Sequence, residues 1–518
     1  MKVILRDDDD LLEKDTSLLL ERYESAKRVR SNWEGLWQDC YDYTLPQRGG
    51  FRSELTPGSA KNENIYDATA MDAVDQLAAS LLGNLTPTWS QWFGLKPGPD
   101  LSKAEAEALA PLLEEAAKTL QAHFDRSNFA VEIHQCYLDL IVGGTASLYF
   151  EEAEPGGFSA FKFTAVPLSH VVLEEGVNGY LDGTFRKLSL TLAQLKACYP
   201  GAVIPPAFEK DGTKDPQARF RILEAVLPDG LVYEFAACLL DQGGAPVLLH
   251  SGRFEESPII NFRWLKSPGE IYGRSPVMKA LPDIKTANKV VELVLKNASI
   301  AVTGIWQADD DGVLNPANIE LKPGSIIPKA IDSKGLQPLE MPGRFDVSEL
   351  MLESLQGRIR HALLTDRLAP VASPRMTATE VLERSAEMSL LLGATYGRLQ
   401  SELLMPLIKR AFQILRRRGE IPDISLDGRL ITVDYRSPLA RSQGQRNVQN
   451  TLSWINSVLA MGPEAASAAN LPQVTRFLGE ALAVPIDLMR REVPVPLVLS
   501  TPQTVNEKET KNEPELVE

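Results

Sequence analysis

The sequence predicts an α+β protein in which helices come first, an antiparallel sheet follows, and long helices make up most of the second half. Two observations support this fold class. Residues 146–264 contain short segments rich in aromatic and β-branched residues, separated by Gly, Pro and Asn turns. Such spacing favours antiparallel pairing over βαβ units. After residue 283 the apolar residues instead recur at helical spacing over much longer stretches.

The helices of the first half are predicted from apolar stripes and from their start and stop signals. A pattern over residues 16–43 stops before Pro46 and the Gly49-Gly50 pair, and Ser102 with Glu105 forms a capping box. The predicted helices cover residues 16–43, 65–85, 102 to about 123 with a possible kink at Pro111, and 128–142. The predicted strands cover residues 146–150, 160–165, 170–173, 184–190, 220–227, 231–240, 247–250 and 259–264.

The second half contains three long helical patterns. The first, residues 283–302, has an apolar stripe wide enough to contact more than one neighbour. The second covers residues 348–364, and the third covers residues 377–418 with a kink expected at Pro406. At 1.5 Å per residue the third helix is about 60 Å long, which implies an elongated shape or an assembly.

The linkers and the C-terminal part complete the prediction. Pro370 and Pro374 interrupt helix within residues 365–376, so the chain should turn there. A strand is expected at residues 431–435, and helices at 443–460 and 472–482. Residues 501–518 are rich in glutamate and poor in apolar residues, which is typical of a flexible acidic tail.

Composition and charge exclude several classes of protein. The chain has 518 residues, of which 44% are hydrophobic and 24% charged, so it can bury a core of about three domains. No apolar run approaches the ~20 residues that span a bilayer, and four consecutive aspartates near the start are unlike a signal peptide. We therefore expect neither a membrane protein nor a secreted one. The formal net charge of −15 argues against tight, static DNA binding over the whole surface.

Signatures of catalysis, metal binding and cofactor binding are missing. The sequence has no GxGxxG, no P-loop, no GxSxG and no HExxH pattern. Cys40, Cys136, Cys198 and Cys238 are far apart, which predicts buried free thiols in a reducing compartment. The run Asp309-Asp310-Asp311-Gly312 lacks the ligand spacing of a calcium loop and predicts a solvated acidic turn. We expect no enzyme activity, no metal and no cofactor.

Five strings of residues, in order along the chain, resemble a known family. They are Tyr66-Asp67-Ala68-Thr69; Leu85-Thr86-Pro87-Thr88-Trp89-Ser90-Gln91-Trp92-Phe93; Tyr272-Gly273-Arg274-Ser275-Pro276 with 280–285 after it; Arg375-Met376-Thr377-Ala378-Thr379-Glu380-Val381 with Arg384 and Glu387; and Ser437-Pro438-Leu439-Ala440-Arg441-Ser442-Gln443. Together they resemble the head-to-tail connector, or portal protein, of short-tailed bacteriophages. By themselves, the strings also fit local roles as turns and helix caps.

The resemblance implies an elongated subunit with an α/β wing, a two-helix stem, a small clip, a long kinked wing helix and a helical crown. Its parts would be residues 1–274 (wing), 275–302 (first stem helix), 303–347 (clip), 348–364 (second stem helix), 365–376 (tunnel loop), 377–435 (long wing helix and strand), 436–500 (crown) and 501–518 (acidic flexible tail).

The resemblance also implies a function and partners. The protein would be made in the bacterial host cytoplasm and form a ring, commonly of twelve subunits, at one capsid vertex of the virion. Double-stranded DNA would pass through it without sequence recognition during packaging and ejection. The implied partners are the terminase large subunit, tail adaptor, scaffold and major capsid proteins, with no membrane. A tail or collar ring without a packaging role is the alternative, and a packaging ATPase or nuclease is disfavoured by the missing motifs.

Three groups of site residues follow from this layout. Stem assembly is expected to involve Ile284, Val291, Val294, Leu295, Leu355 and Ile359. Terminase or adaptor docking at the clip is expected to involve Trp306, Asp309, Asp310 and Asp311. In the tunnel loop, Arg367 and Arg375 either contact DNA phosphates or form salt bridges to a neighbouring subunit, and the sequence favours neither.

Overall fold

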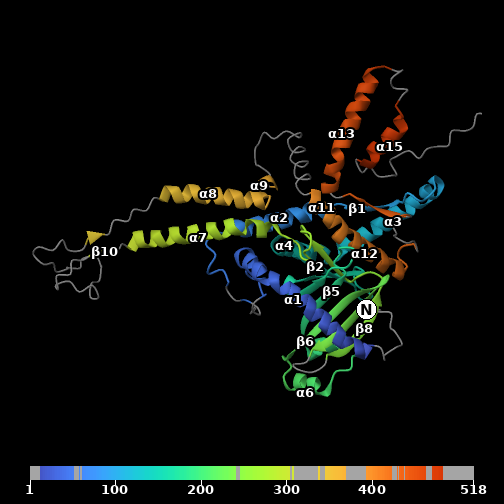
Figure 1. The fold of residues 1–518 in the computed structure, drawn as a ribbon. Coiled ribbons are helices and arrows are strands. Elements are labelled where there is room, and N and C mark those ends of the chain that lie inside the picture. The colour runs from blue at the N-terminus through green and yellow to red at the C-terminus, as the bar shows by residue number, and fades with distance from the viewer. Residues whose placement is uncertain are drawn as a thin grey trace, which may run out of the picture. The chain divides into compact units, whose positions relative to one another are not determined.

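The computed structural model describes residues 12–51, 58, 61–240, 246–303, 306–307, 337–338, 345–368, 393–422, 429, 431–436, 438–462 and 469–481 (Figure 1). The chain divides into two compact units, Met1–Gln443 and Gly444–Glu518. The first unit contains both helices and antiparallel sheets, which confirms the mixed helix and sheet class predicted from the sequence.

Helix α4 is at the centre of the first unit. It covers Phe129–Gly143, and Ile133, Tyr137, Leu140 and Ile141 are fully buried. It packs against strand β2 and against α1, α2 and α7. The other helices of this layer are α1 (Leu12–Thr44), α2 (Thr69–Leu85) and α3 (Lys103–Arg126).

These helices confirm the predicted ones, although α1 begins four residues earlier than predicted, α3 ends about three residues later and α2 begins four residues later. The capping box of α3 is present. The Ser102 backbone N–H donates a hydrogen bond to the Glu105 carboxylate, and the Glu105 backbone N–H donates one to Ser102 Oγ. Helix α2 begins at Thr69 and not at residue 65. The preceding N–H groups of Tyr66 and Asp67 donate instead to the side-chain oxygen of Asn288, which keeps this segment out of the helix.

Antiparallel strands follow, as predicted, but they form two sheets and not one. One has the strand order β4-β5-β6-β7-β8, and the other β3-β2-β9. The strands are β2 (Thr145–Glu152), β3 (Phe161–Val166), β4 (Val171–Glu174), β5 (Gly183–Thr191), β6 (Arg219–Asp229), β7 (Val232–Leu240), β8 (Val247–Phe254) and β9 (Ile259–Arg263). The short helices α5 (Leu192–Cys198) and α6 (Pro206–Lys214), between β5 and β6, were not predicted.

A further pairing joins segments from opposite ends of the first unit. Strand β1 (Phe93–Pro97) pairs antiparallel with β12 (Ile431–Tyr435), from Phe93 opposite Tyr435 to Pro97 opposite Ile431. The sequence predicted β12 but not β1. Five residues carry little periodicity by themselves, and the partner strand is more than 300 residues away along the chain.

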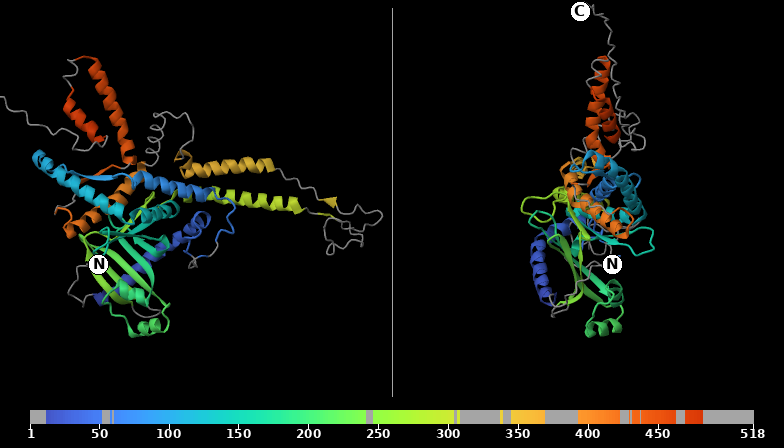
Figure 2. Two further views of the ribbon diagram at one scale, coloured as in Figure 1. Left: turned by 180° about the vertical axis from the view of Figure 1, so that it is seen from behind. Right: turned by 90° about the vertical axis from the view of Figure 1, so that its right-hand side faces the viewer.

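The two helices expected to form the stem are α7 (Pro276–Thr303) and α8 (Phe345–Ala362), which lie side by side in Figures 1 and 2. Both begin earlier than predicted. Helix α7 begins at Pro276 and continues through Pro282, where the sequence pattern had suggested a start at 283. Ser275 caps its first turn, because its Oγ accepts from the Met278 N–H at 2.9 Å. The two-residue strands β10 (Trp306–Gln307) and β11 (Gln337–Pro338) pair with each other.

The loop predicted at residues 365–376 is wrong for its first four residues. Thr365–Leu368 form one helical turn, α9, directly after α8. Thr365 contributes to this turn, since its Oγ1 donates to the Arg360 carbonyl at 3.2 Å. The remaining residues of the predicted loop lie outside the described residues.

The long helix predicted at residues 377–418 is described from residue 393 onward, and its predicted start lies outside the described residues. It consists of α11 (Gly393–Leu399), a π-helical turn at Gln400–Leu404 and α12 (Met405–Arg418). The π-turn directly precedes Pro406, which has no N–H to donate to the carbonyl four residues earlier. The kink predicted at Pro406 stays a prediction, and the irregularity that the structure shows is the π-turn just before it.

The described part of the second unit consists of two helices side by side (Figure 2). Helix α13 covers Pro438–Ala460 and enters this unit at Gly444, and α15 covers Leu471–Ala481. The sequence placed the start of α13 five residues too late, although proline is favoured at the first position of a helix. Residues 501–518 lie outside the described residues.

The cysteine prediction is confirmed for three residues and wrong for one. Cys40, Cys136 and Cys238 are free and buried, whereas Cys198 is free but exposed. It ends α5, a two-turn helix in which Leu195 is the buried residue. A helix this short covers too little surface to bury a side chain at its end.

Candidate assembly surface

The string Tyr272-Gly273-Arg274-Ser275-Pro276 holds the start of α7 against the core. Tyr272 is fully buried, packs edge-on against Trp37 at a ring distance of 4.9 Å, and accepts from the Leu173 N–H. Ser275 Oγ donates to the Val142 carbonyl at the end of α4 at 2.9 Å. The local role of this string, as a turn that precedes a helix, is confirmed.

A close approach of two glycines fixes the same turn. Gly144, which ends α4 with φ of +76°, lies against Gly273. A Cβ atom on Gly144 would be 2.3 Å from the Gly273 carbonyl oxygen, and one on Gly273 would be 2.1 Å from the Gly144 carbonyl oxygen. Helix α7 therefore starts from a backbone contact that tolerates no side chain on either residue.

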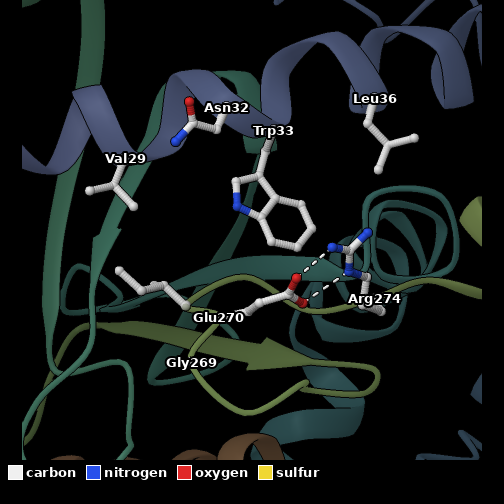
Figure 3. Close-up of a pocket in the computed structure, with 8 residues that line it drawn as sticks. Val29, Asn32, Trp33, Leu36, Gly269, Glu270 and Arg274 are labelled. Carbon is white, nitrogen blue, oxygen red and sulfur yellow. Dashed lines mark hydrogen bonds and ion pairs between the residues drawn. The ribbon is translucent and has the colours of Figure 1, made fainter.

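Arg274 closes one side of a small pocket between α1 and this turn (Figure 3). Its guanidinium lies 4.5 Å from the Trp33 ring centroid and is paired with Glu270 through two hydrogen bonds. These hydrogen bonds lower the pKa of the Glu270 carboxyl. The pocket has a volume of about 400 Å³ and is lined by Val29, Asn32, Trp33, Leu36, Gly269, Glu270, Ile271 and Arg274.

A buried ion pair joins the π-turn between α11 and α12 to the same turn. Arg263, at the end of β9, is fully buried and donates from Nη2 to Glu402 Oε1 at 2.7 Å. Its Nη1 donates to the Ile271 carbonyl at 2.9 Å, and its Nη2 also donates to the Gly179 carbonyl at 2.8 Å. Glu402 lies in the π-turn, so one guanidinium connects this irregular turn to the segment before α7.

The string Tyr66-Asp67-Ala68-Thr69 also contacts α7 and α8. Asn288 of α7 accepts from the Tyr66 N–H at 2.6 Å and donates to the Asn64 carbonyl at 2.9 Å. Gln356 of α8 donates to Asp67 Oδ2 at 3.3 Å. Two of the five strings that carry the family resemblance therefore lie where α7 and α8 leave the core.

Helices α7 and α8 pack against each other through the faces that the sequence predicted. Ile284, Leu355 and Ile359 are buried in the main core cluster, which Val290 and Leu352 also contact. An ion pair between Asp283 and Arg358, 2.9 Å long, joins the two helices on their surface. Three of the six residues expected to form the stem assembly therefore pack within one subunit.

The other three candidates lie farther along α7, where burial ends. Beyond Asn288, no α7 side chain that the structure describes is buried. Val291 and Val294 are half-buried, and Leu295 is 52% exposed. Three further exposed residues were not among the sequence candidates: Leu293 at 49%, Leu350 at 70% and Met351 at 50%. The unusually wide apolar stripe of α7 was the signal for Leu293.

The exposed leucines of α7 lie on two different sides of the helix. Residues two apart are rotated by about 200° around a helix axis, so Leu293 and Leu295 point in nearly opposite directions. One of these sides also carries charge, because Glu292 binds both Lys289 at 2.9 Å and Lys296 at 2.5 Å. The two hydrogen bonds lower the pKa of Glu292. Residues 289–296 of α7 thus have both apolar and charged side chains on their exposed surface.

The remaining candidates cannot be placed. Arg375 and Asp309, Asp310 and Asp311 lie outside the described residues, as do the side chains of Arg367 and Trp306. Their proposed contacts stay predictions.

The described residues show no assembled metal site. Among them, no group of three or more His, Cys, Asp or Glu side chains is placed to hold a metal ion. In the same part of the chain, no helix is both long and apolar enough to cross a membrane.

Comparison with known proteins gives one consistent result. The family described as "Bacteriophage head to tail connecting protein" matches residues 16–489. A probable portal protein of Bordetella phage BPP-1 is 24% identical over 481 residues, 86% of this chain and 84% of that protein. The portal protein of Salmonella phage epsilon15 is 23% identical over 510 residues, 92% of this chain and 88% of that protein. A solved chain from the neck of an empty gene transfer agent particle aligns with a TM-score of 0.35 and 12% identity, over 76% of this chain and 90% of that one.

Proposed function

The chain belongs to the bacteriophage head-to-tail connecting protein family, and on that premise we propose that it is the subunit of a portal ring through which double-stranded DNA enters and leaves a capsid. Portal proteins are structural, and this chain is a structural component of the virion and not an enzyme. The ring would have about twelve copies at one vertex. Terminase would dock on it first and tail adaptors later, while scaffold and major capsid proteins surround it.

The observation that carries this proposal is the apolar surface on two sides of α7. Leu293 and Leu295 are each about half exposed and point in nearly opposite directions. A single partner on one side would leave the other leucine in water. In a closed ring every subunit has two neighbours and presents a different surface to each, so both sides are covered. Leu350 and Met351 of α8 add apolar surface to the same helix pair.

The parts of the subunit follow from the family layout. We propose that α7 and α8 form the channel wall, residues 303–347 the clip that faces terminase and adaptors, and residues 365–376 the tunnel loop. With twelve copies the formal charge is 12 × −15 = −180. An acidic excess repels phosphates, which lowers the affinity of the ring for passing DNA.

Leu295→Glu is expected to prevent ring formation while leaving the subunit folded. In the ring this glutamate would be a buried and unpaired charge, which costs several kcal/mol per interface, whereas the single subunit holds residue 295 half in water. Native mass measurement and end-on electron microscopy would show single subunits. Leu231→Glu is the control, because Leu231 is 96% exposed in the β6–β7 turn. Rings of unchanged mass for Leu295→Glu would contradict the placement of α7 in the interface.

Replacing both Arg367 and Arg375 with alanine is expected to leave the ring intact but to impair DNA packaging or retention. The substitution removes a phosphate-binding group from every subunit, so its effect is multiplied around the ring, and screening makes that effect largest at low salt. The measurement is packaged DNA length per particle across ionic strengths. Unchanged DNA at every salt concentration would exclude channel contacts, and loss of the ring would favour salt bridges between subunits. Absence of the protein from particles without tails would instead indicate a collar ring.

A further inference from the structure

The described part of the second unit is a pair of helices with very little core of its own. Its buried apolar side chains, among the residues described, are Val448 and Ile455 of α13 and Ala469 before α15. The two described helices by themselves bury too little apolar surface to be stable alone. Other groups, from the rest of this unit or from another copy, therefore cover part of their surface.

Four large apolar side chains remain exposed on α13 and its end. They form two pairs with the same spacing: Leu452 with Leu459, and Trp454 with Met461, each seven residues apart. Seven residues are about two helical turns, so the members of a pair lie on one side of the helix. Leu452 and Trp454 differ by two residues and hence by about 200°. The helix thus has two apolar rows on different sides, the leucine row (Leu452, Leu459) and the tryptophan row (Trp454, Met461).

The surroundings of these rows are uncharged. Residues 447–462 contain no Asp, Glu, Lys or Arg, and the polar positions between the apolar ones are Asn, Gln, Ser and Thr. The cores of protein interfaces are depleted in charged residues and enriched in Trp and Met. A segment that contacted DNA phosphates would instead carry basic residues.

We propose that the second unit assembles with the second unit of the neighbouring copy, the leucine row of one packing against the tryptophan row of the next. The proposal rests on the ring proposed above and assigns to α13 an interface of its own, separate from that of α7. The occupant is a second copy because the two rows match each other. Both have the same seven-residue spacing, about 10.5 Å along the axis, so helices related by rotation about a ring axis can align Leu452 with Trp454 and Leu459 with Met461.

Cysteine cross-linking in the full-length ring tests this pairing. In a Cys198→Ser background, which removes the exposed native thiol, Leu452→Cys is combined with Trp454→Cys. Positions two apart on a helix do not face each other, so a disulfide can form only between copies. We expect mild oxidation to give a ladder of linked subunits on a non-reducing gel, up to the full ring. The matched control combines Leu452→Cys with Ser453→Cys, where Ser453 is exposed and belongs to neither row. It should give no ladder.

The outcomes separate this inference from the proposed function. Particles that show no ring by mass measurement contradict the portal ring itself. Intact rings without a ladder contradict only the pairing of second units, and maleimide labelling then identifies the reason. Rapid labelling of both cysteines means that the rows face water, and blocked labelling means that another segment, such as residues 482–500 of the same chain, covers them.

Discussion

Gly144→Ala is expected to be among the most destabilising single changes in the first unit. The residue has φ of +76°, which costs a side-chain-bearing residue about 1–2 kcal/mol. Its new Cβ would lie 2.3 Å from the Gly273 carbonyl oxygen, and backbone on both sides leaves no flexible group to move. Relieving such overlap costs a further 1–3 kcal/mol or so. Urea or thermal unfolding should therefore show a loss of about 2–5 kcal/mol, a large part of the stability of a typical domain.

Gly230→Ala is the matched control for this prediction. Gly230 has a similar φ of +62° in the β6–β7 turn, but nothing lies within 4 Å of the place where an alanine Cβ would sit. Its substitution should cost only the backbone strain, about 1–2 kcal/mol. The difference between the two variants measures the contact between Gly144 and Gly273. Equal losses would show that this contact does not hold the start of α7.

This glycine contact shows where sequence patterns stop being informative. The predicted end of α4 at residue 142 is within one residue of the observed end at Gly143, because a helix end leaves a local signal such as the glycine that follows it. The approach of Gly144 to Gly273 leaves none, since it depends on two residues far apart in the chain. For the same reason the sequence predicted β12 but missed its partner β1. Local periodicity identifies helices and strands, whereas their contacts depend on tertiary packing.

The candidate assembly surface was predicted in part. The wide stripe of α7 predicted more than one neighbour, and within the subunit α7 packs against α8, α4 and α1. The stripe could not separate residues that pack on α8 from those left exposed. Ile284, Leu355 and Ile359 turned out to be buried within the subunit, while Leu295 is exposed. Leu350 and Met351 carried no distinctive signal, because they precede the regular apolar spacing of α8. Only the three-dimensional structure shows which of these side chains are buried within the subunit and which are exposed.

The buried pair of Arg263 and Glu402 had no sequence signal at all. Charged residues are rarely fully buried, so neither was a candidate for the core. In the structure, Arg263 directs hydrogen bonds to Glu402, Glu175 and two backbone carbonyls. Glu402 also accepts from Arg398 one turn earlier, at 2.9 Å. The pair joins the end of β9, the turn before α7 and the π-turn between α11 and α12.

Arg263→Ala is therefore expected to destabilise the first unit by about 3–5 kcal/mol, because it leaves Glu402 buried without its main partner. Replacing Arg263 and Glu402 together should cost less than the sum of the two single losses, since the double variant has no unpaired charge between them. The free energy of unfolding of the four proteins gives the coupling directly. Lys196→Ala is the control, because it breaks an ion pair with Glu209 in which both side chains are about half exposed. That loss should be at most about 1 kcal/mol. An Arg263→Ala variant as stable as Lys196→Ala would show that Arg263 does not connect the π-turn before α12 to the start of α7.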